Sequence, residues 1–111
     1  MQLSEAEWRI MNAVWAHHPT TAREVLEVVV KETGWAYTTV KTMMNRLVEK
    51  GVLREKKAKG TSQYEPKLTR QKARAAALRA VVDRAFGGAV APMMNFLVED
   101  EKLSKKERDE L

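Results

Sequence analysis

The stretch that decides the fold is TTVKTMMNRLVEKG, residues 38–51. Its apolar residues follow the i, i+3, i+4, i+7, i+8 spacing of one buried helical face, and they are Val40, Met43, Met44, Leu47 and Val48. The opposite face carries hydroxyls, a carboxamide and cations, which can hydrogen-bond base edges and reach phosphates. A polar helix face by itself is more often only solvated. The neighbouring segments favour a DNA recognition helix, whose expected contacts are Thr38, Thr39, Lys41, Thr42, Asn45 and Arg46.

Two helices are predicted before this stretch, and each begins with a capping box. Ser4 and Glu7 start the first helix, which we expect to reach about residue 17. Thr21 and Glu24 start the second, over about residues 22–33, and Gly34 is its expected C-terminal cap. A helix, a short turn and a polar-fronted helix form the helix-turn-helix pattern of DNA-binding proteins.

A β-hairpin is predicted directly after the recognition helix. Residues 52–58 and 61–65 can form two strands, joined by the turn Lys59-Gly60 and stopped by Pro66. A hairpin with lysines near its tip, following a recognition helix, is a wing that can contact DNA. Lysines also protect exposed strand edges from aggregation, and that alternative stays open. The expected DNA contacts of the wing are Arg54, Lys56, Lys57 and Lys59.

The charge of the chain is concentrated in its middle. Residues 41–79 hold twelve Lys and Arg against three Glu, whereas the whole chain has a net charge of +5. The remaining residues are therefore net acidic. A concentrated positive region attracts phosphate backbones, so the distribution nominates a polyanionic partner.

Composition describes a folded protein with one main core. The chain has 111 residues, 44% of them hydrophobic and 32% charged, which is more aliphatic than disordered chains are. Cysteine is absent, which removes disulfides and thiolate sites and is compatible with a reducing cytoplasm. No signal peptide and no apolar run long enough to span a bilayer is present, so we expect a cytoplasmic protein without membrane insertion.

The C-terminal part offers amphipathic helices without a core of their own. We expect helices over about residues 70–86 and 89–98, and a last helix that opens at Ser104. Their apolar faces need a partner surface, and a second copy of the chain matches the symmetry of palindromic operators. We therefore expect a DNA-binding domain over 1–68 and a dimerisation region over 69–111. The expected dimerisation residues are Leu78, Val81, Val82, Phe86, Met93 and Leu97.

Catalytic and metal sites are not indicated. The chain has no glycine-rich phosphate loop, no His-Glu zinc motif and no nucleophile with a plausible base. His17 and His18 are adjacent, so they point in different directions, which disfavours a shared metal ion. We interpret them as cations at a helix C-terminus. We expect no enzymatic activity, no cofactor and no metal.

Four segments, in this order, resemble the penicillinase-repressor family (BlaI/MecI type). They are LSEAEWRIMNAVW, TTVKTMMNRLVEKGVL, the YEP after the hairpin, and MNFLVEDEKLS. The resemblance covers essentially the whole chain. It implies a mostly helical protein with a small hairpin wing, a winged helix-turn-helix joined to a helical dimerisation region. It also implies a non-enzymatic homodimer that represses transcription at inverted-repeat operators of double-stranded DNA, commonly in front of β-lactam resistance genes.

The resemblance further implies how repression ends. In the family's best-known members an Asn-Phe bond in the dimerisation part is cut after a membrane β-lactam sensor triggers a protease, and Asn95-Phe96 stands in the matching place. Copper-responsive relatives carry cysteine clusters that this chain lacks. Two alternatives stay open: a winged-helix regulator of another regulon, and a winged-helix module that binds protein or RNA.

Overall fold

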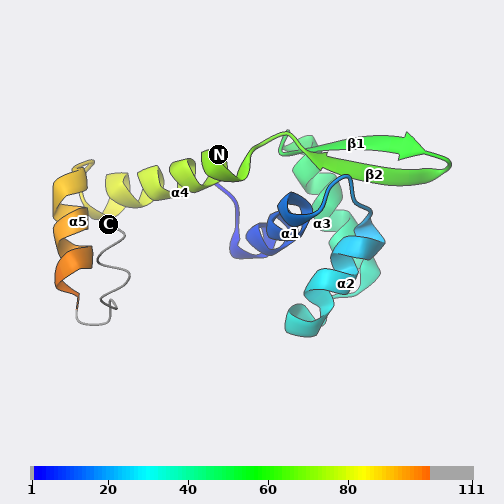
Figure 1. Ribbon diagram of the computed structural model, residues 1–111, viewed down its shortest axis with the longest axis horizontal. Coiled ribbons are helices and arrows are strands. Elements are labelled where there is room, and N and C mark those ends of the chain that lie inside the picture. Colours follow the sequence, from blue (N-terminus) through cyan, green and yellow to red (C-terminus); the bar gives the residue numbers. More distant parts are fainter. Residues whose placement is uncertain (1, 101–111) are drawn as a thin grey trace. The chain divides into compact units, whose positions relative to one another are not determined.

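The computed structural model describes residues 2–100, which form helices and a hairpin (Figure 1). The elements are α1 (Glu5–Ala16), α2 (Ala22–Thr33), α3 (Tyr37–Glu49), β1 (Leu53–Ala58), β2 (Thr61–Pro66), α4 (Arg70–Ala85) and α5 (Val90–Glu99). The prediction of a mostly helical chain with a small hairpin wing is confirmed. The helix expected to open at Ser104 lies outside the described residues.

Local sequence rules explain where the first helices begin and end. The Ser4 hydroxyl accepts from the Glu7 N–H at 3.1 Å and the Glu7 carboxylate accepts from the Ser4 N–H at 2.9 Å, which completes a capping box. Thr21 and Glu24 form the same pair of hydrogen bonds at the start of α2. Gly34 ends α2 with a φ of 67°, a conformation that glycine adopts without a Cβ clash. All three predicted caps are confirmed.

The hairpin is held in register by a two-residue turn. Lys59 and Gly60 have φ values of 53° and 79°, and Ala58 pairs with Thr61 across the turn. Positive φ at both central residues is the geometry that matches the twist of a hairpin. Thr20, just before α2, pairs with Tyr64 through backbone hydrogen bonds of 3.1 and 2.7 Å. The base of the wing is therefore attached to the segment that precedes α2.

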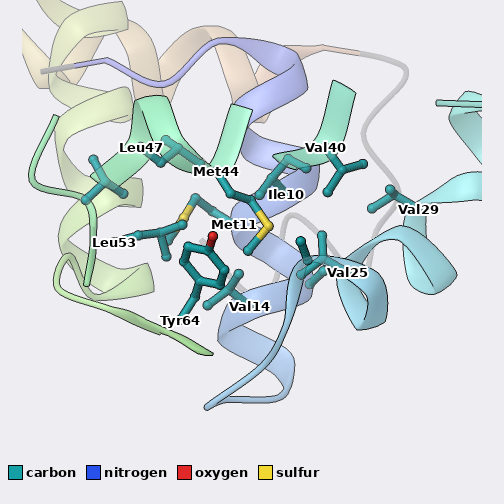
Figure 2. Packing of buried hydrophobic residues seen from close by; sticks show 13 residues of the cluster. Ile10, Met11, Val14, Val25, Val29, Val40, Met44, Leu47, Leu53 and Tyr64 are labelled. Atoms are coloured by element: carbon teal, nitrogen blue, oxygen red, sulfur yellow. The ribbon is translucent and has the colours of Figure 1, made fainter. Parts of the chain in front are cut away.

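Two compact units share the chain, and their boundary falls within α4 between Arg74 and Ala75. The first unit has a core in which α1, α2 and α3 pack together with the strands. Figure 2 shows the Tyr64 ring lying among Met11, Val14 and Leu53. The buried cluster is formed by Ile10, Met11, Ala13, Val14, Ala22, Val25, Val29, Val40, Met44, Leu47, Val52, Leu53 and Tyr64.

The second unit contains most of α4 and all of α5. Val82 and Met93 are its buried hydrophobic residues among residues 75–100. The Phe86 and Phe96 rings lie 6.3 Å apart between centroids. Several large apolar side chains stay exposed, namely Leu78, Val81, Val90, Phe96 and Val98. No helix within residues 2–100 combines the length and the apolar character needed to cross a membrane.

An ion pair joins α1 to the C-terminal end of α3. The ammonium of Lys50, the C-cap of α3, donates to the buried Glu7 carboxylate at 2.6 Å. A cation at a helix C-terminus is favourable. Burial alone would raise the pKa of the Glu7 carboxyl, but the hydrogen bonds from Lys50 and Ser4 outweigh it and hold the pKa below its usual 4.5. Glu7 therefore stabilises the fold in its charged form.

We expect Glu7→Gln to lower the free energy of unfolding by about 0.5–1.5 kcal/mol at neutral pH. Because the folded pKa of Glu7 is lowered, its contribution is complete above the unfolded value of 4.5 and is lost as the pH falls through the folded value. Urea unfolding at one protein concentration, at neutral and at acidic pH, measures the loss of stability and its dependence on pH. The control is Glu5→Gln, an exposed carboxylate of the same first turn. An equal loss for both variants, or a loss that persists in acid, contradicts the assignment.

Candidate nucleic-acid interface

The outer face of α3 is polar and open. The opposite face is fully buried through Val40, Met44 and Leu47, and this fixes which side chains of the helix point outward. The exposed positions on α3 include most of the residues predicted to contact DNA, namely Thr38, Thr39, Thr42, Asn45 and Arg46. No acidic residue occupies the first turn, and Ala36 at the N-cap makes no side-chain hydrogen bond. The first backbone N–H groups are thus free of side-chain caps, which suits an approaching phosphate.

The wing supplies cations beside this face. Lys56, Lys57 and Lys59 are exposed and form no ion pair with any residue in the range 2–100. The Arg54 guanidinium lies 4.0 Å from the Glu65 carboxylate, and both side chains are well exposed. An exposed ion pair of this kind contributes little and is easily exchanged for a phosphate.

Helix α3 and the hairpin enclose a groove of about 600 Å³. Lys41, Asn45, Val48 and Glu49 line it from α3, and Glu55, Lys57 and Ser62 line it from the strands. Of the predicted contacts, Lys41 and Asn45 on the helix and Lys57 on the wing therefore line one concave surface, and the other predicted helix and wing residues are not among its lining residues. The predicted dimerisation and cleavage residues lie in the second unit, with Asn95 and Phe96 on the exposed side of α5.

Lys41 is the exception among the predicted contacts on α3. Its ammonium donates a hydrogen bond to the Tyr64 hydroxyl and lies 3.8 Å from the Glu55 carboxylate. The hydrogen bond to Tyr64, together with the nearby Glu55 charge, raises the pKa of Lys41 above its usual value, against the effect of burial. Lys41 is thus engaged within the protein, whereas its neighbours on the helix face are open.

A second concavity, of about 470 Å³, lies between the start of α2, the start of α3 and the hairpin turn. Arg23 and Tyr37 line it, and the Arg23 guanidinium lies 4.9 Å from the centre of the Tyr37 ring. Stacking on an aromatic ring orients a guanidinium without neutralising it. Our sequence analysis did not include either residue. An Arg in the first turn of α2 and a Tyr opening α3 were the available signals, but their proximity depends on the turn between the helices.

Within residues 2–100 the structure shows no group of His, Asp or Glu side chains arranged to hold a metal ion. The polar groups that line the groove are the ammonium groups of Lys41 and Lys57, the Asn45 amide, the Ser62 hydroxyl and the carboxylates of Glu49 and Glu55. The Ser62 hydroxyl donates a hydrogen bond to the Glu55 carboxylate. The hydroxyl and amide groups on the exposed face of α3, together with the exposed lysines of the wing, are suited to binding a polyanion.

Comparisons with known proteins agree on one family. A family model described as penicillinase repressor matches residues 3–111. The penicillinase repressor of Bacillus licheniformis is 28% identical over 110 residues, which cover 99% of this chain and 86% of that protein. The solution structure of the DNA binding domain of the repressor BlaI aligns with a TM-score of 0.57 at 31% identity, over 64% of this chain and 87% of that one. Bacillus licheniformis BlaI, in monomeric form in complex with the blaP half-operator, aligns with a TM-score of 0.56 at 30% identity, over 65% and 88% of the two chains.

Proposed function

Since the chain belongs to the penicillinase repressor family, we propose that it represses β-lactam resistance genes by binding inverted-repeat operators as a homodimer. As a member of this family it is a transcriptional repressor that binds operator DNA, and it is not an enzyme. Its site of action would be the cytoplasm, where a bacterial operator lies. No cofactor enters the proposal.

The observation that supports DNA reading most directly is the open polar face of α3 beside the wing. We propose that Thr38, Thr39, Thr42, Asn45 and Arg46 enter the major groove. Lys56, Lys57 and Lys59 on the wing would neutralise phosphates, and Arg54 would do so by leaving Glu65. The solved relative that binds a half-operator supports this arrangement, because it aligns with 65% of this chain at 30% identity.

The proposed homodimer rests on the second unit. Residues 1–68 would read DNA and residues 69–111 would hold two copies together. Leu78, Val81 and Phe96 expose apolar surface that a partner copy would cover. Val82 and Met93, which we also expected at the interface, are already buried in the single chain. They would support the interface from inside.

The proposed end of repression is proteolysis at Asn95-Phe96. Both residues lie within α5, and 59% of the Phe96 surface is exposed. A protease needs an extended substrate, so cleavage would wait for local unfolding of α5. We propose that a protease triggered by a membrane β-lactam sensor makes this cut and that the dimer then separates.

We expect Asn45→Ala to weaken binding to the operator by about 1–3 kcal/mol and to leave binding to random DNA almost unchanged. The reason is that a carboxamide reads base edges, whereas random DNA is held through phosphates. Footprinting upstream of the chain's own gene locates the operator, and fluorescence titration at one salt concentration measures both affinities. Asn12→Ala, an exposed position on α1, is the matched control. A full chain that protects no upstream site contradicts the proposed function, and an equal loss on both DNAs contradicts the role of Asn45.

We expect Val81→Asp to give a monomer whose first unit stays folded, because 43% of Val81 is exposed and the core of the first unit has no residue from the second. Sedimentation velocity measures the oligomeric state, and circular dichroism checks the fold. Ala76→Asp is the control, since Ala76 lies on the face of α4 that carries Arg79 and Asp83. A Val81→Asp protein that sediments as a tight dimer places the interface elsewhere.

We expect a chain that ends at Asn95 to bind the full operator about 10²- to 10⁴-fold more weakly than the 111-residue chain, because linked half-sites gain a high effective concentration. Its affinity for an isolated half-site should be the same, since α3 and the wing are intact. Titration of both chains against both duplexes separates the loss of dimer linkage from any loss of contacts within one half-site. Treatment of cells with a β-lactam should also produce a fragment that ends at Asn95. Equal affinity of the two chains for the full operator would falsify release by this cut.

A further inference from the structure

Lys41 lies at the edge of the open face of α3, and its charge is directed into the protein. Only 30% of its side chain is exposed. Its ammonium donates to the Tyr64 hydroxyl, lies 5.0 Å from the centre of the Tyr64 ring and lies 3.8 Å from the Glu55 carboxylate. The lysine therefore contacts two residues of the wing, Tyr64 and Glu55, before any ligand arrives.

These interactions involve both strands of the wing. Glu55 on β1 and Tyr64 on β2 are cross-strand partners, so their side chains project from the same face of the hairpin. The Ser62 hydroxyl donates to the Glu55 carboxylate, and the Tyr64 backbone is paired with Thr20 in front of α2. One ammonium group thus connects α3 to both strands and, through Tyr64, to the segment before α2.

We propose that Lys41 is a positioning residue that fixes the wing relative to α3, so that operator recognition depends on Lys41 through Tyr64 and Glu55 and not through contact with DNA. The inference rests on the proposed use of α3 and the wing as one DNA-binding surface. It changes our sequence-based prediction, in which Lys41 reached the DNA itself.

The alternative is that Lys41 leaves the wing and binds a phosphate, and the surroundings make this exchange unfavourable. Tyr64 is fully buried, and its hydroxyl would lose its hydrogen-bond partner. Glu55 would keep a carboxylate in the groove without the cation that faces it, next to an incoming polyanion. The raised pKa of Lys41 agrees with a charge that is stabilised where it lies.

Positioning matters because the helix and the wing bind the same duplex. Two contacts on one rigid surface reinforce each other only when their spacing matches the DNA. A wing that pivots still attracts phosphates through its free lysines, so random DNA is held as before. Loss of the Lys41 connection should therefore reduce the preference for the operator over random DNA.

The test compares Lys41→Met and Tyr64→Phe in the full chain on operator and random duplexes over a range of salt. Tyr64→Phe removes one hydroxyl and no charge, and the ring can still fill the core. Each variant should lose about tenfold in operator affinity, the factor expected for one hydrogen bond to a charged group, with little change on random DNA. The double variant should lose no more than one single variant, because both changes break one connection. Hydrogen exchange of the wing amides in the free protein should become faster in both variants.

Lys57→Met is the matched control. Lys57 lines the same groove but is exposed and has no ion pair within residues 2–100. The Lys57→Met variant should bind operator and random DNA more weakly by the same factor. It should also reduce the slope of log K against log salt by about 0.9 per subunit. Lys41→Met should leave that slope unchanged, because a Lys41 that does not bind a phosphate releases no counterion from the DNA.

Three results would overturn the inference. The first is a Lys41→Met protein whose salt slope falls as it does in Lys57→Met. The second is a Tyr64→Phe protein that binds the operator as tightly as the unmodified chain or more tightly, since a freed Lys41 would then reach the DNA. The third is unchanged hydrogen exchange in the wing. An unmodified chain with no preference for its operator would overturn the proposed function as well, whereas a preference that survives Tyr64→Phe contradicts the positioning role alone.

Discussion

The burial of one face of α3 is the constraint on which the rest of the structure depends. Val40, Met44 and Leu47 are completely removed from water, and each fully buried side chain of this size contributes roughly 1.5–3 kcal/mol. Because a helix is rigid, burying these residues fixes the rotation of α3 about its own axis. The hydroxyl, amide and guanidinium groups on the other side then point outward together. The chemistry of the DNA-binding surface is thus set by the hydrophobic effect on its opposite side.

Tyr64 connects that core to the wing. Its ring is part of the buried cluster (Figure 2). Its backbone pairs with Thr20, and its hydroxyl accepts from Lys41. A hairpin of two strands is only marginally stable in water by itself. One aromatic residue with three kinds of contact therefore gives the wing a defined place against α3. The groove between them follows from this attachment and not from the strands alone.

Most elements of the fold could be predicted because the rules that form them are local. A capping box spans four residues, Gly34 ends a helix by its own conformation, and Lys59-Gly60 closes a hairpin between adjacent strands. The site was predictable only in part. Lys41 meets Tyr64 across 23 positions of sequence, and a helical pattern that marks Lys41 as polar does not say which group it faces. Val82 and Met93 show the same limit, because their spacing marks an apolar face but not whether the same chain covers it.

The two units differ in how much apolar surface they bury, and this difference bears on regulation. The first unit encloses a cluster whose members all lie between Ile10 and Tyr64. Among residues 75–100 the buried hydrophobic residues are Val82 and Met93, while Leu78, Val90 and Phe96 remain exposed. Local opening needs less free energy where few side chains are buried. Under the proposed function, a protease would therefore find its substrate in α5 far more often than in α3. Cleavage there would end pairing while the DNA-reading surface stays folded, since no residue of its core is lost.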